Sequence, residues 1–519
     1  VARTSFVQAF PWFLMNVARH FFGRYSLVRD AGREFLPTGL PAGEGDHHFP
    51  PAATPRLLML YNRRTVTSPL ERLEAFVRAL LAEPQRGRRA YPIALLLFIL
   101  AVWFPALFTG LDLASPDDFY HTTQAALHHT PRDIADWFTR GYWAYTHFEY
   151  RPLTRLSVLA DWLIFGPRPW GFHLVNVLLH FGCAFLLAAA LTRVGAPIWG
   201  ARLSGLVAAV FPPGQMAVSW INGRQDLLCG LLLLAALCLW LDWLAGKPWA
   251  RLLGAAVCAL LSALAKEPGA VAPALFLAAG FIMPTRRSAP RRVAAALAAL
   301  PLVPYIILRL RAWPMADYAA QNAAQLRSLG VGITWLFSDL LVPRPYELAT
   351  TWVSQSWFIL FSPRFPRLLL EQAAFWAGFV ILLKRQPRPL ALCVCWKALL
   401  FLPVYNLYWN PAFTHYRYLP HLGTAALVGL AAWELAGWAA ARMHQWGRPL
   451  LRWSIIAVGL ALLLRYYTGQ LELRWPSWSL IRQGGPKPSA AFGRSLTGPG
   501  APRLDDSAIY PPGERPSER

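Results

Sequence analysis

Two adjacent acids, Asp117 and Asp118, stand in the first polar stretch after the first long apolar run of the chain. The apolar run extends from Tyr91 to Gly110, and the next residues read LDLASPDDFYH. A carboxylate beside a bilayer is costly to desolvate, so acids in such places are candidates for function. The alternative is a solvated Asp pair that caps the following helix. The pair therefore suggests chemistry at a lipid boundary, with a helix cap as the simpler interpretation.

Further polar residues recur in turns that we place on the same side of the membrane. They are Arg151, Arg224 and Asp226, Lys266 and Glu267, and the run from His415 to Tyr418. Arg224 and Asp226 could simply pair and cap a helix, and Lys266 with Glu267 could form only a paired helix break. Their gathering on one side instead predicts an external cavity that contains a base and several cations. Such a cavity suits an anionic, lipid-linked substrate.

His173, Asn176 and His180 follow at spacings of three and four residues, which puts them on one stripe of a helix. A metal site would need carboxylate or further His support. The six cysteines lie inside apolar runs and show no metal-ligand spacing. We therefore expect the stripe to face a polar interior or to hydrogen-bond a headgroup. No cofactor is expected, although a divalent cation could bind at Asp117.

The composition places these residues in a membrane. Hydrophobic residues make up 55% of the chain, and runs of 15 to 25 residues carry almost no charge; such a run is long enough to cross a hydrocarbon core. The net charge of +23 gathers in clusters between these runs, such as residues 86–89, 286–292 and 384–388. That is the pattern of cytoplasmic loops, and it argues against a nucleic-acid partner. The sequence predicts an all-α polytopic membrane protein, and its Ala-, Arg- and Pro-rich composition favours a bacterial inner membrane.

The basic clusters also predict a topology. Residues 1–90 form a cytoplasmic extension, residues 91–482 a transmembrane domain of about 11 to 13 helices, and residues 483–519 a disordered external tail. Residues 111–169 form a large first external loop with surface helices, one at 132–145 and one that begins at Pro152. After the first span, further spans are expected near 170–193, 202–218, 227–244, 293–310, 368–383, 389–404, 418–440 and 453–466.

The stretch from Leu252 to Met283 needs two crossings, because basic clusters flank both of its ends. As one helix it would be about 48 Å long, too long for a single span. Two short helices should therefore meet at Lys266, Glu267 and Pro268. Lys266 and Glu267 would then lie below the outer membrane surface, where they should line a cavity open to water.

Four motifs in order, YRPLTRLS, GFHLVNVLLH, VSWINGRQDLL and LSALAKEPGAV, resemble signatures of the GT-C glycosyltransferases. They are most similar to the transmembrane, tetratricopeptide-bearing O-mannosyltransferase-like proteins and their bacterial relatives. A fifth stretch, LPVYNLYWNPAFTHYRYLPHLG, is similar to a later block of that family. The resemblance covers Leu111–Pro284 and Leu402–Gly423. Each motif alone is weak, and five in this order are fairly specific.

The resemblance implies a GT-C-like bundle and an inverting transferase that uses a polyprenyl-phosphate sugar. It places the base, an acid of the first external loop, at Asp118 or its neighbour Asp117. One carboxylate suffices, because it accepts the proton of the acceptor hydroxyl, and the leaving phosphate needs cations rather than a second acid. Arg417 matches the family's Arg and is the first choice to hold the phosphate. After it come Arg151, Arg224 and Lys266. The supporting polar residues are expected to be His173, Asn176, His180, Asp226, Glu267 and Tyr418.

The chain departs from the family in two places. The later block of the family usually reads Glu-Arg-Tyr-Leu-Tyr-Leu-Pro-Ser, whereas this chain has Tyr416 before the Arg and His421 after the Pro. No 34-residue helical repeats follow the last expected span, so the identity of the acceptor stays open among a protein, a lipid and a glycan.

The expected partners are the polyprenyl-phosphate sugar, membrane lipid and that acceptor, at a site that faces the periplasm or cell exterior. The alternatives are a transporter or flippase of lipid-linked glycans, with polar residues through both leaflets, and an inactive homologue that acts as a membrane assembly partner.

Overall fold

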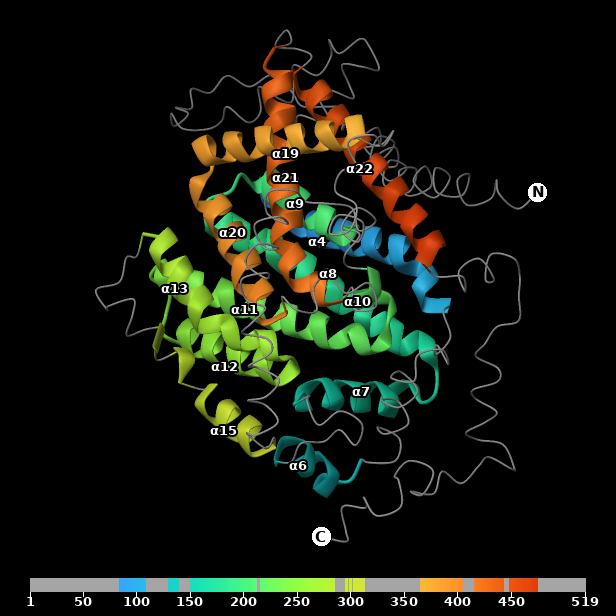
Figure 1. Ribbon diagram of the computed structural model, residues 1–519, viewed down its shortest axis with the longest axis vertical. Coiled ribbons are helices and arrows are strands. Elements are labelled where there is room, and N and C mark those ends of the chain that lie inside the picture. The colour runs from blue at the N-terminus through green and yellow to red at the C-terminus, as the bar shows by residue number, and fades with distance from the viewer. Residues whose placement is uncertain are drawn as a thin grey trace, which may run out of the picture. The chain divides into compact units, whose positions relative to one another are not determined.

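In the part of the chain that a computed structural model describes, every regular element is a helix (Figure 1). The described residues are 84–108, 129–139, 150–211, 215–284, 295–296, 298–300, 302–312, 365–404, 415–442 and 448–474. The elements are α4 (Pro84–Trp103), η3 (Phe104–Phe108), α6 (Pro131–Thr139), α7 (Pro152–Phe165), α8 (Pro169–Arg193), α9 (Ile198–Ala209), α10 (Gln215–Ser219), η5 (Ile221–Gly223), α11 (Arg224–Leu244), α12 (Ala250–Ala265), η6 (Glu267–Val271), α13 (Ala272–Ile282), α15 (Leu302–Ala312), α19 (Phe365–Arg385), α20 (Pro387–Phe401), η7 (Leu402–Val404), α21 (Tyr418–Ala440) and α22 (Arg448–Arg474).

Several of these helices are long and apolar enough to cross a membrane. Among the described residues five segments meet this condition: Ala90–Leu107, Pro169–Arg193, Ile221–Leu244, Pro387–Val404 and His415–Ala440. Shorter apolar helices lie at Ile198–Ala209, Ala250–Ala265, Glu267–Ile282 and Leu451–Leu464. The chain is a polytopic membrane protein, as its hydropathy predicted. The full count of 11 to 13 spans stays a prediction, because many residues lie outside the described ranges.

Prolines set several helix boundaries. Pro152 and Pro169 occupy the first turns of α7 and α8, where a missing amide hydrogen costs nothing. Helix α12 ends at Ala265, because Lys266 is extended (φ −160°, ψ 148°), and Pro268 has no amide hydrogen to continue an α-helical ladder. The short 3-10 helix η6 then leads into α13. The predicted break within this stretch is confirmed.

The third expected span, residues 202–218, differs from the structure. Helix α9 runs from Ile198 to Ala209, and the short α10 begins at Gln215. The sequence places two prolines, Pro212 and Pro213, after this helix, and a proline disfavours helical geometry in the residue before it.

The expected surface helix at 132–145 is present as α6, Pro131–Thr139, and its last six expected residues lie outside the described ones.

Helices α9 and α21 approach each other at small residues. A Cβ atom at Gly429 in α21 would lie 2.4 Å from the Cα atom of Ser204 in α9, so glycine is required for this contact. The Ser204 hydroxyl lies 3.0 Å from the carbonyl oxygens of Gly200 and Ala426. Close backbone approach and an interhelical hydrogen bond are the main sources of helix association in lipid.

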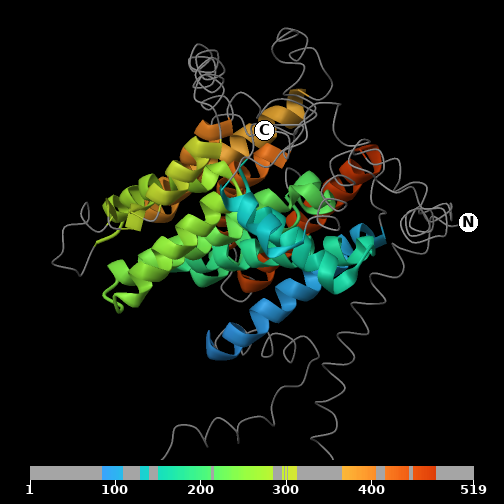
Figure 2. The same cartoon turned by 90° about the horizontal axis from the view of Figure 1, so that it is seen from below.

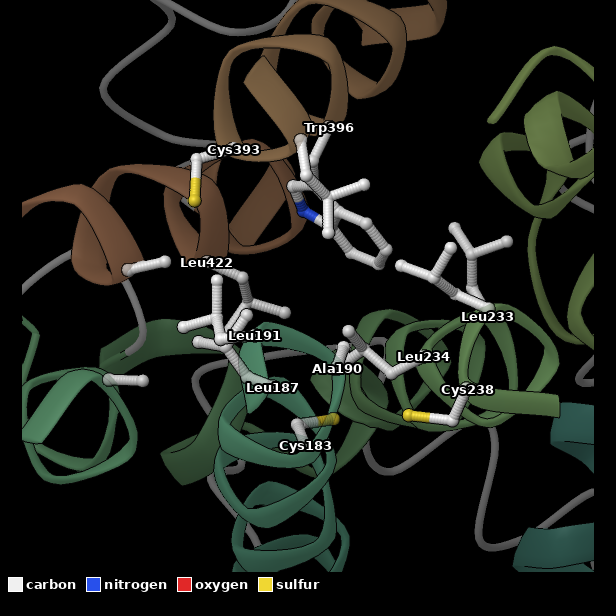
Figure 3. Packing of buried hydrophobic residues seen from close by; sticks show 14 of the residues in the cluster. Cys183, Leu187, Ala190, Leu191, Leu233, Leu234, Cys238, Cys393, Trp396 and Leu422 are labelled. Carbon is white, nitrogen blue, oxygen red and sulfur yellow. The ribbon is translucent and has the colours of Figure 1, made fainter. Parts of the chain in front are cut away.

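Figure 3 shows the apolar core between α8, α11, α20 and α21. Leu187 and Leu191 of α8 and Leu234 of α11 line it together with Trp396 of α20. The Trp396 indole nitrogen donates a hydrogen bond to the Leu419 carbonyl oxygen at 2.8 Å, which satisfies its polar atom inside the core. This core holds the ends of the four helices in a fixed relation.

Contacts at both ends of the bundle give the helix directions. At one end Asn176 of α8 meets Arg224 of α11, and at the other Arg193 of α8 meets Asp242 of α11, each at 2.9 Å. These two helices are therefore parallel. Helix α12 returns in the opposite direction, because Lys266 at its end contacts the first turn of α11. These directions agree with the predicted order of crossings; which end faces outward stays a prediction.

Helix α7 lies across the first of these ends. It packs on α8, α11 and α12, and α6 packs on α7 and α15. Figure 1 shows α7 below α11 and α12, and Figure 2 shows it in front of the bundle when seen from below. The surface helix of the first expected loop therefore covers the end that carries the conspicuous polar residues.

Candidate functional site

A buried ion pair joins the start of α11 to the end of α12. The Lys266 Nζ atom lies 2.7 Å from each carboxylate oxygen of Asp226, and the two side chains are 0% and 1% exposed. The ring of Tyr416, just before α21, lies 4.2 Å from the same Nζ atom. The expectation that Lys266 lines an open, watery cavity is therefore not met. The Asp226 carboxylate neutralises the lysine charge, which has lost its hydration by burial.

A second ion pair connects the start of α7 to η6. Arg151 contacts Glu267 through Nε at 3.1 Å and through Nη2 at 2.9 Å, and it also hydrogen-bonds the Gln225 side chain. Arg309 of α15 reaches the other oxygen of Glu267 at 3.2 Å. One carboxylate thus serves two guanidinium groups. This pair lies nearer the surface, since the Glu267 and Arg309 side chains are 23% and 16% exposed.

Tyr150 fixes the position of its neighbour Arg151. Its hydroxyl donates a hydrogen bond to the Phe138 carbonyl oxygen in α6 at 2.7 Å, and its ring lies 5.9 Å from that of Tyr305 in α15. Burial raises the pKa of Tyr150 to about 12, so its hydroxyl keeps its proton. Helices α6, α7 and α15 are joined at this point, directly beside the second ion pair.

Arg224 belongs to a separate network. Its Nη1 atom lies 2.5 Å from Asp161 of α7, its Nε atom donates to Asn176 of α8 at 2.9 Å, and its Nη2 atom donates to the Phe172 carbonyl oxygen at 2.8 Å. Burial raises the pKa of Asp161, and the Arg224 charge opposes this shift. The guanidinium is 0% exposed. Arg224 thus ties α7, α8 and α11 together, and it does not pair with Asp226.

The polar stripe of α8 faces the protein interior, as one of the two interpretations predicted. Asn176 donates to the Trp220 carbonyl oxygen at 2.9 Å. The two ring nitrogens of His180 lie 3.0 Å from the Tyr418 hydroxyl and 3.2 Å from the Ala209 carbonyl oxygen. His173 is also buried. These side chains join α8 to the segment after α9 and to the start of α21.

Arg417 stands at the beginning of α21 between two residues of these networks. Tyr416 contacts Lys266, and Tyr418 contacts His180. The Arg417 side chain is only 4% exposed. Its position therefore adds another guanidinium to the end of the bundle that carries Arg151, Arg224 and Arg309.

The proposed base lies outside the described residues. Asp117 and Asp118 are both in the stretch 109–128, of whose structure nothing is described. Within the described ranges, no group of three His, Cys, Asp or Glu residues could hold a metal ion. The roles of the two acids therefore stay predictions.

Among the side chains that the structure describes, the two ion pairs together contain more cations than carboxylates. Arg151, Lys266 and Arg309 supply three cations against the carboxylates of Asp226 and Glu267. Such an arrangement can neutralise a bound anion at low dielectric, where charge-assisted hydrogen bonds are strong. Glu267 and Arg309 are the most accessible part of the cluster, with side chains 23% and 16% exposed, whereas the Arg151 side chain is only 5% exposed.

Several of these contributors were not among the expected site residues. Gln225 and Tyr416 lie inside the family-like motifs, and Asp161 lies in the otherwise apolar stretch VLADWLIF that follows YRPLTRLS. Arg309 follows the apolar run LVPYIIL, a position that is usual for an arginine reaching toward a membrane surface. An acid in an apolar helix is a usable signal. The other contributors are recognised only by the side chains that they contact in the structure.

No family model matches the chain. Its curated relatives include protein O-mannosyl-transferase TMTC2 of Homo sapiens, 35% identical over 130 residues, which are 24% of this chain and 15% of the relative. Protein O-mannosyl-transferase Tmtc3 of Drosophila melanogaster is 31% identical over 174 residues, or 27% and 19% of the two chains. The chain therefore matches only a small part of these relatives' length. The resemblance to the O-mannosyltransferase-like proteins is confirmed.

Among solved structures, the chain is similar to the archaeal oligosaccharyltransferase AglB from Archaeoglobus fulgidus in complex with an inhibitory peptide and a dolichol-phosphate. The TM-score is 0.46 at 12% sequence identity, over 80% of this chain and 59% of the other.

Proposed function

We propose that the protein is an inverting glycosyltransferase that moves a sugar from a polyprenyl-phosphate donor to an acceptor hydroxyl at the outer membrane face. The three cations that share two carboxylates in the described ion pairs carry this proposal. A buried cation excess in a membrane domain is costly, and a lipid-linked phosphate is an anion that would offset it. The similarity to protein O-mannosyl-transferases favours sugar transfer as the reaction and mannose as the first sugar to test.

In this proposal the phosphate approaches from the exposed side of the second ion pair. Arg151 and Arg309 already share the Glu267 carboxylate, and a phosphate oxygen offers them a second acceptor of the same kind. Arg417 remains the first choice among the four cations predicted from the sequence. Arg224 is the least favoured of them, because Asp161, Asn176 and a backbone carbonyl group engage its guanidinium.

The reaction needs one base and no protonation of the leaving group. Asp118, or Asp117 beside it, would accept the proton of the acceptor hydroxyl as its oxygen attacks the anomeric carbon of the sugar. The bond from that carbon to the phosphate oxygen breaks, and the cations take up the negative charge of the released polyprenyl phosphate. A single displacement of this kind inverts the anomeric configuration.

The location and the acceptor are also part of the proposal. The composition favours a bacterial inner membrane, with the site facing the periplasm, whereas the relatives named above are animal proteins. The acceptor is a protein, a lipid or a glycan. The reaction as written uses no cofactor, and a divalent cation at Asp117 is the exception to test by chelation.

The proposal is tested with purified protein in lipid and a panel of polyprenyl-phosphate sugars, by scoring the release of polyprenyl phosphate. We expect release with one sugar and loss of release in Asp118→Asn. Asp136→Asn, in helix α6 of the same expected loop, is the matched control and should stay active. Release that is equal in the wild type and the Asp118→Asn variant would contradict the chemistry. Movement of the intact donor across the membrane without release would favour a flippase.

A further inference from the structure

A basic cluster stands at the opposite end of the bundle from the candidate site. There Asp242, near the end of α11, meets three basic side chains from three segments. Arg193 at the end of α8 contacts it at 2.9 Å, Lys247 after α11 at 2.8 Å and Arg251 in the first turn of α12 at 3.7 Å. Among the described residues, one carboxylate therefore contacts three cations, and these four ionised side chains sum to a charge of about +2.

The cations of this cluster are accessible although their carboxylate is not. The side chains of Arg193, Lys247 and Arg251 are 33%, 49% and 46% exposed, whereas that of Asp242 is 5% exposed. Asp242 thus contacts the three cations from the buried side of the cluster and holds them close together. Like charges held so close repel one another, so an anion on their exposed side would be stabilised.

An apolar stripe begins beside the cluster on α12. Trp249, Leu253 and Val257 are 54%, 67% and 44% exposed, and their spacing of four residues puts them on one face of the helix. The Trp249 ring lies 5.4 Å from the buried ring of Trp243, which fixes it at the helix start. Tryptophan at such a position is typical of the boundary between headgroups and acyl chains.

We propose that this cluster and stripe bind an anionic phospholipid. The headgroup phosphate lies against Lys247 and Arg251, and one acyl chain runs along Trp249, Leu253 and Val257. The charge excess selects an anionic over a zwitterionic headgroup, and the stripe selects a lipid over a free phosphate ion. In the predicted topology this end is cytoplasmic, and the surface of that leaflet attracts basic segments. The inference is independent of the proposed glycosyltransferase activity.

The test is native mass spectrometry of the full-length protein in detergent, titrated with phosphatidylglycerol and separately with phosphatidylcholine. A basic residue at an anionic membrane surface contributes about 1 kcal/mol, or roughly a five-fold change in affinity. The double variant Lys247→Gln/Arg251→Gln should therefore bind phosphatidylglycerol about 25-fold more weakly. Its affinity for phosphatidylcholine should change little.

The matched control is Lys384→Gln/Arg388→Gln, two exposed cations where α19 meets α20. It removes the same charge but leaves the cluster intact, so its phosphatidylglycerol affinity should stay near that of the wild type. Arg251→Gln alone, which removes the longest of the three contacts, should lose about five-fold and guards against misfolding of the double variant. Equal losses in both double variants, or no loss in the first, would overturn the proposal.

Discussion

Removing Asp226 should destabilise the protein far more than removing Asp226 and Lys266 together. The two side chains are 1% and 0% exposed and meet at 2.7 Å through both carboxylate oxygens. In Asp226→Asn the lysine charge stays buried without its counter-charge. The Tyr416 ring, 4.2 Å from Nζ, offsets only part of this loss, since a desolvated cation–π contact contributes about 2 kcal/mol.

The expected magnitude follows from the burial of both partners. Breaking a buried ion pair by removing one partner typically costs about 3 to 5 kcal/mol, so Asp226→Asn and Lys266→Met should each lose about that much. Replacing a whole buried pair by apolar groups of similar volume is often close to neutral, and the buried Asn amide adds a desolvation cost of about 1 to 3 kcal/mol when it is left without a partner. The double variant Asp226→Asn/Lys266→Met should therefore lose about 2 kcal/mol or less, far below the sum of the single losses.

The assay is equilibrium unfolding in mixed micelles, followed by circular dichroism and compared as a double-mutant cycle. Arg385→Gln is the control, because the Arg385 side chain is 58% exposed in its pair with Glu434, and exposed pairs contribute about 1 kcal/mol or less. Additive losses in the cycle would refute the reasoning. So would a loss in Asp226→Asn no larger than that in Arg385→Gln, since both results mean that Lys266 is not held by Asp226.

The remaining predictions concern the chemistry and the topology. Arg417→Ala should lose roughly ten- to hundred-fold in donor use, measured as kcat/KM, since a charge-assisted contact to phosphate contributes about 1.5 to 3 kcal/mol; unchanged donor kinetics would make Arg417 structural. Asp118→Asn should lose about 10² to 10⁴ in turnover with near-normal donor binding, and Asp117→Asn should lose less; the reverse order would move the base one residue upstream. In a background without the native cysteines, a membrane-impermeant thiol reagent should label Ser115→Cys but not Ser288→Cys in intact cells, and the opposite pattern would contradict the topology.

Hydropathy and proline positions were sufficient to predict most helix limits. Helix α21 has the predicted bounds, Tyr418–Ala440, and α12 ends at the predicted break before Lys266. These features are local, because apolar length and the missing proline amide act within a few residues. The third expected span differs from the structure for the same local reason, because the sequence has Pro212 and Pro213 near the middle of that span.

The partners of the charged residues could not be predicted in this way. Arg224 and Asp226 stand two apart, and such residues on a helix do not face each other, so a pairing between them is disfavoured. They turn to Asp161 of α7 and Lys266 after α12 instead. These contacts join residues that are far apart in sequence. A single sequence shows which groups are costly to bury but not which group offsets the cost.

At this end of the bundle, the number and burial of the groups that contact each cation indicate whether its role is structural or functional. Arg224 is fully buried, and Asp161, Asn176 and a backbone carbonyl group engage its guanidinium, so binding a phosphate there would first break contacts that join three helices. Arg309 instead shares one carboxylate with Arg151 and is partly exposed, so a phosphate oxygen can reach it without separating α7, α8 and α11. The donor is therefore expected to bind where one carboxylate serves two arginines, and the fully engaged arginine should serve to hold α7, α8 and α11 in register beneath it.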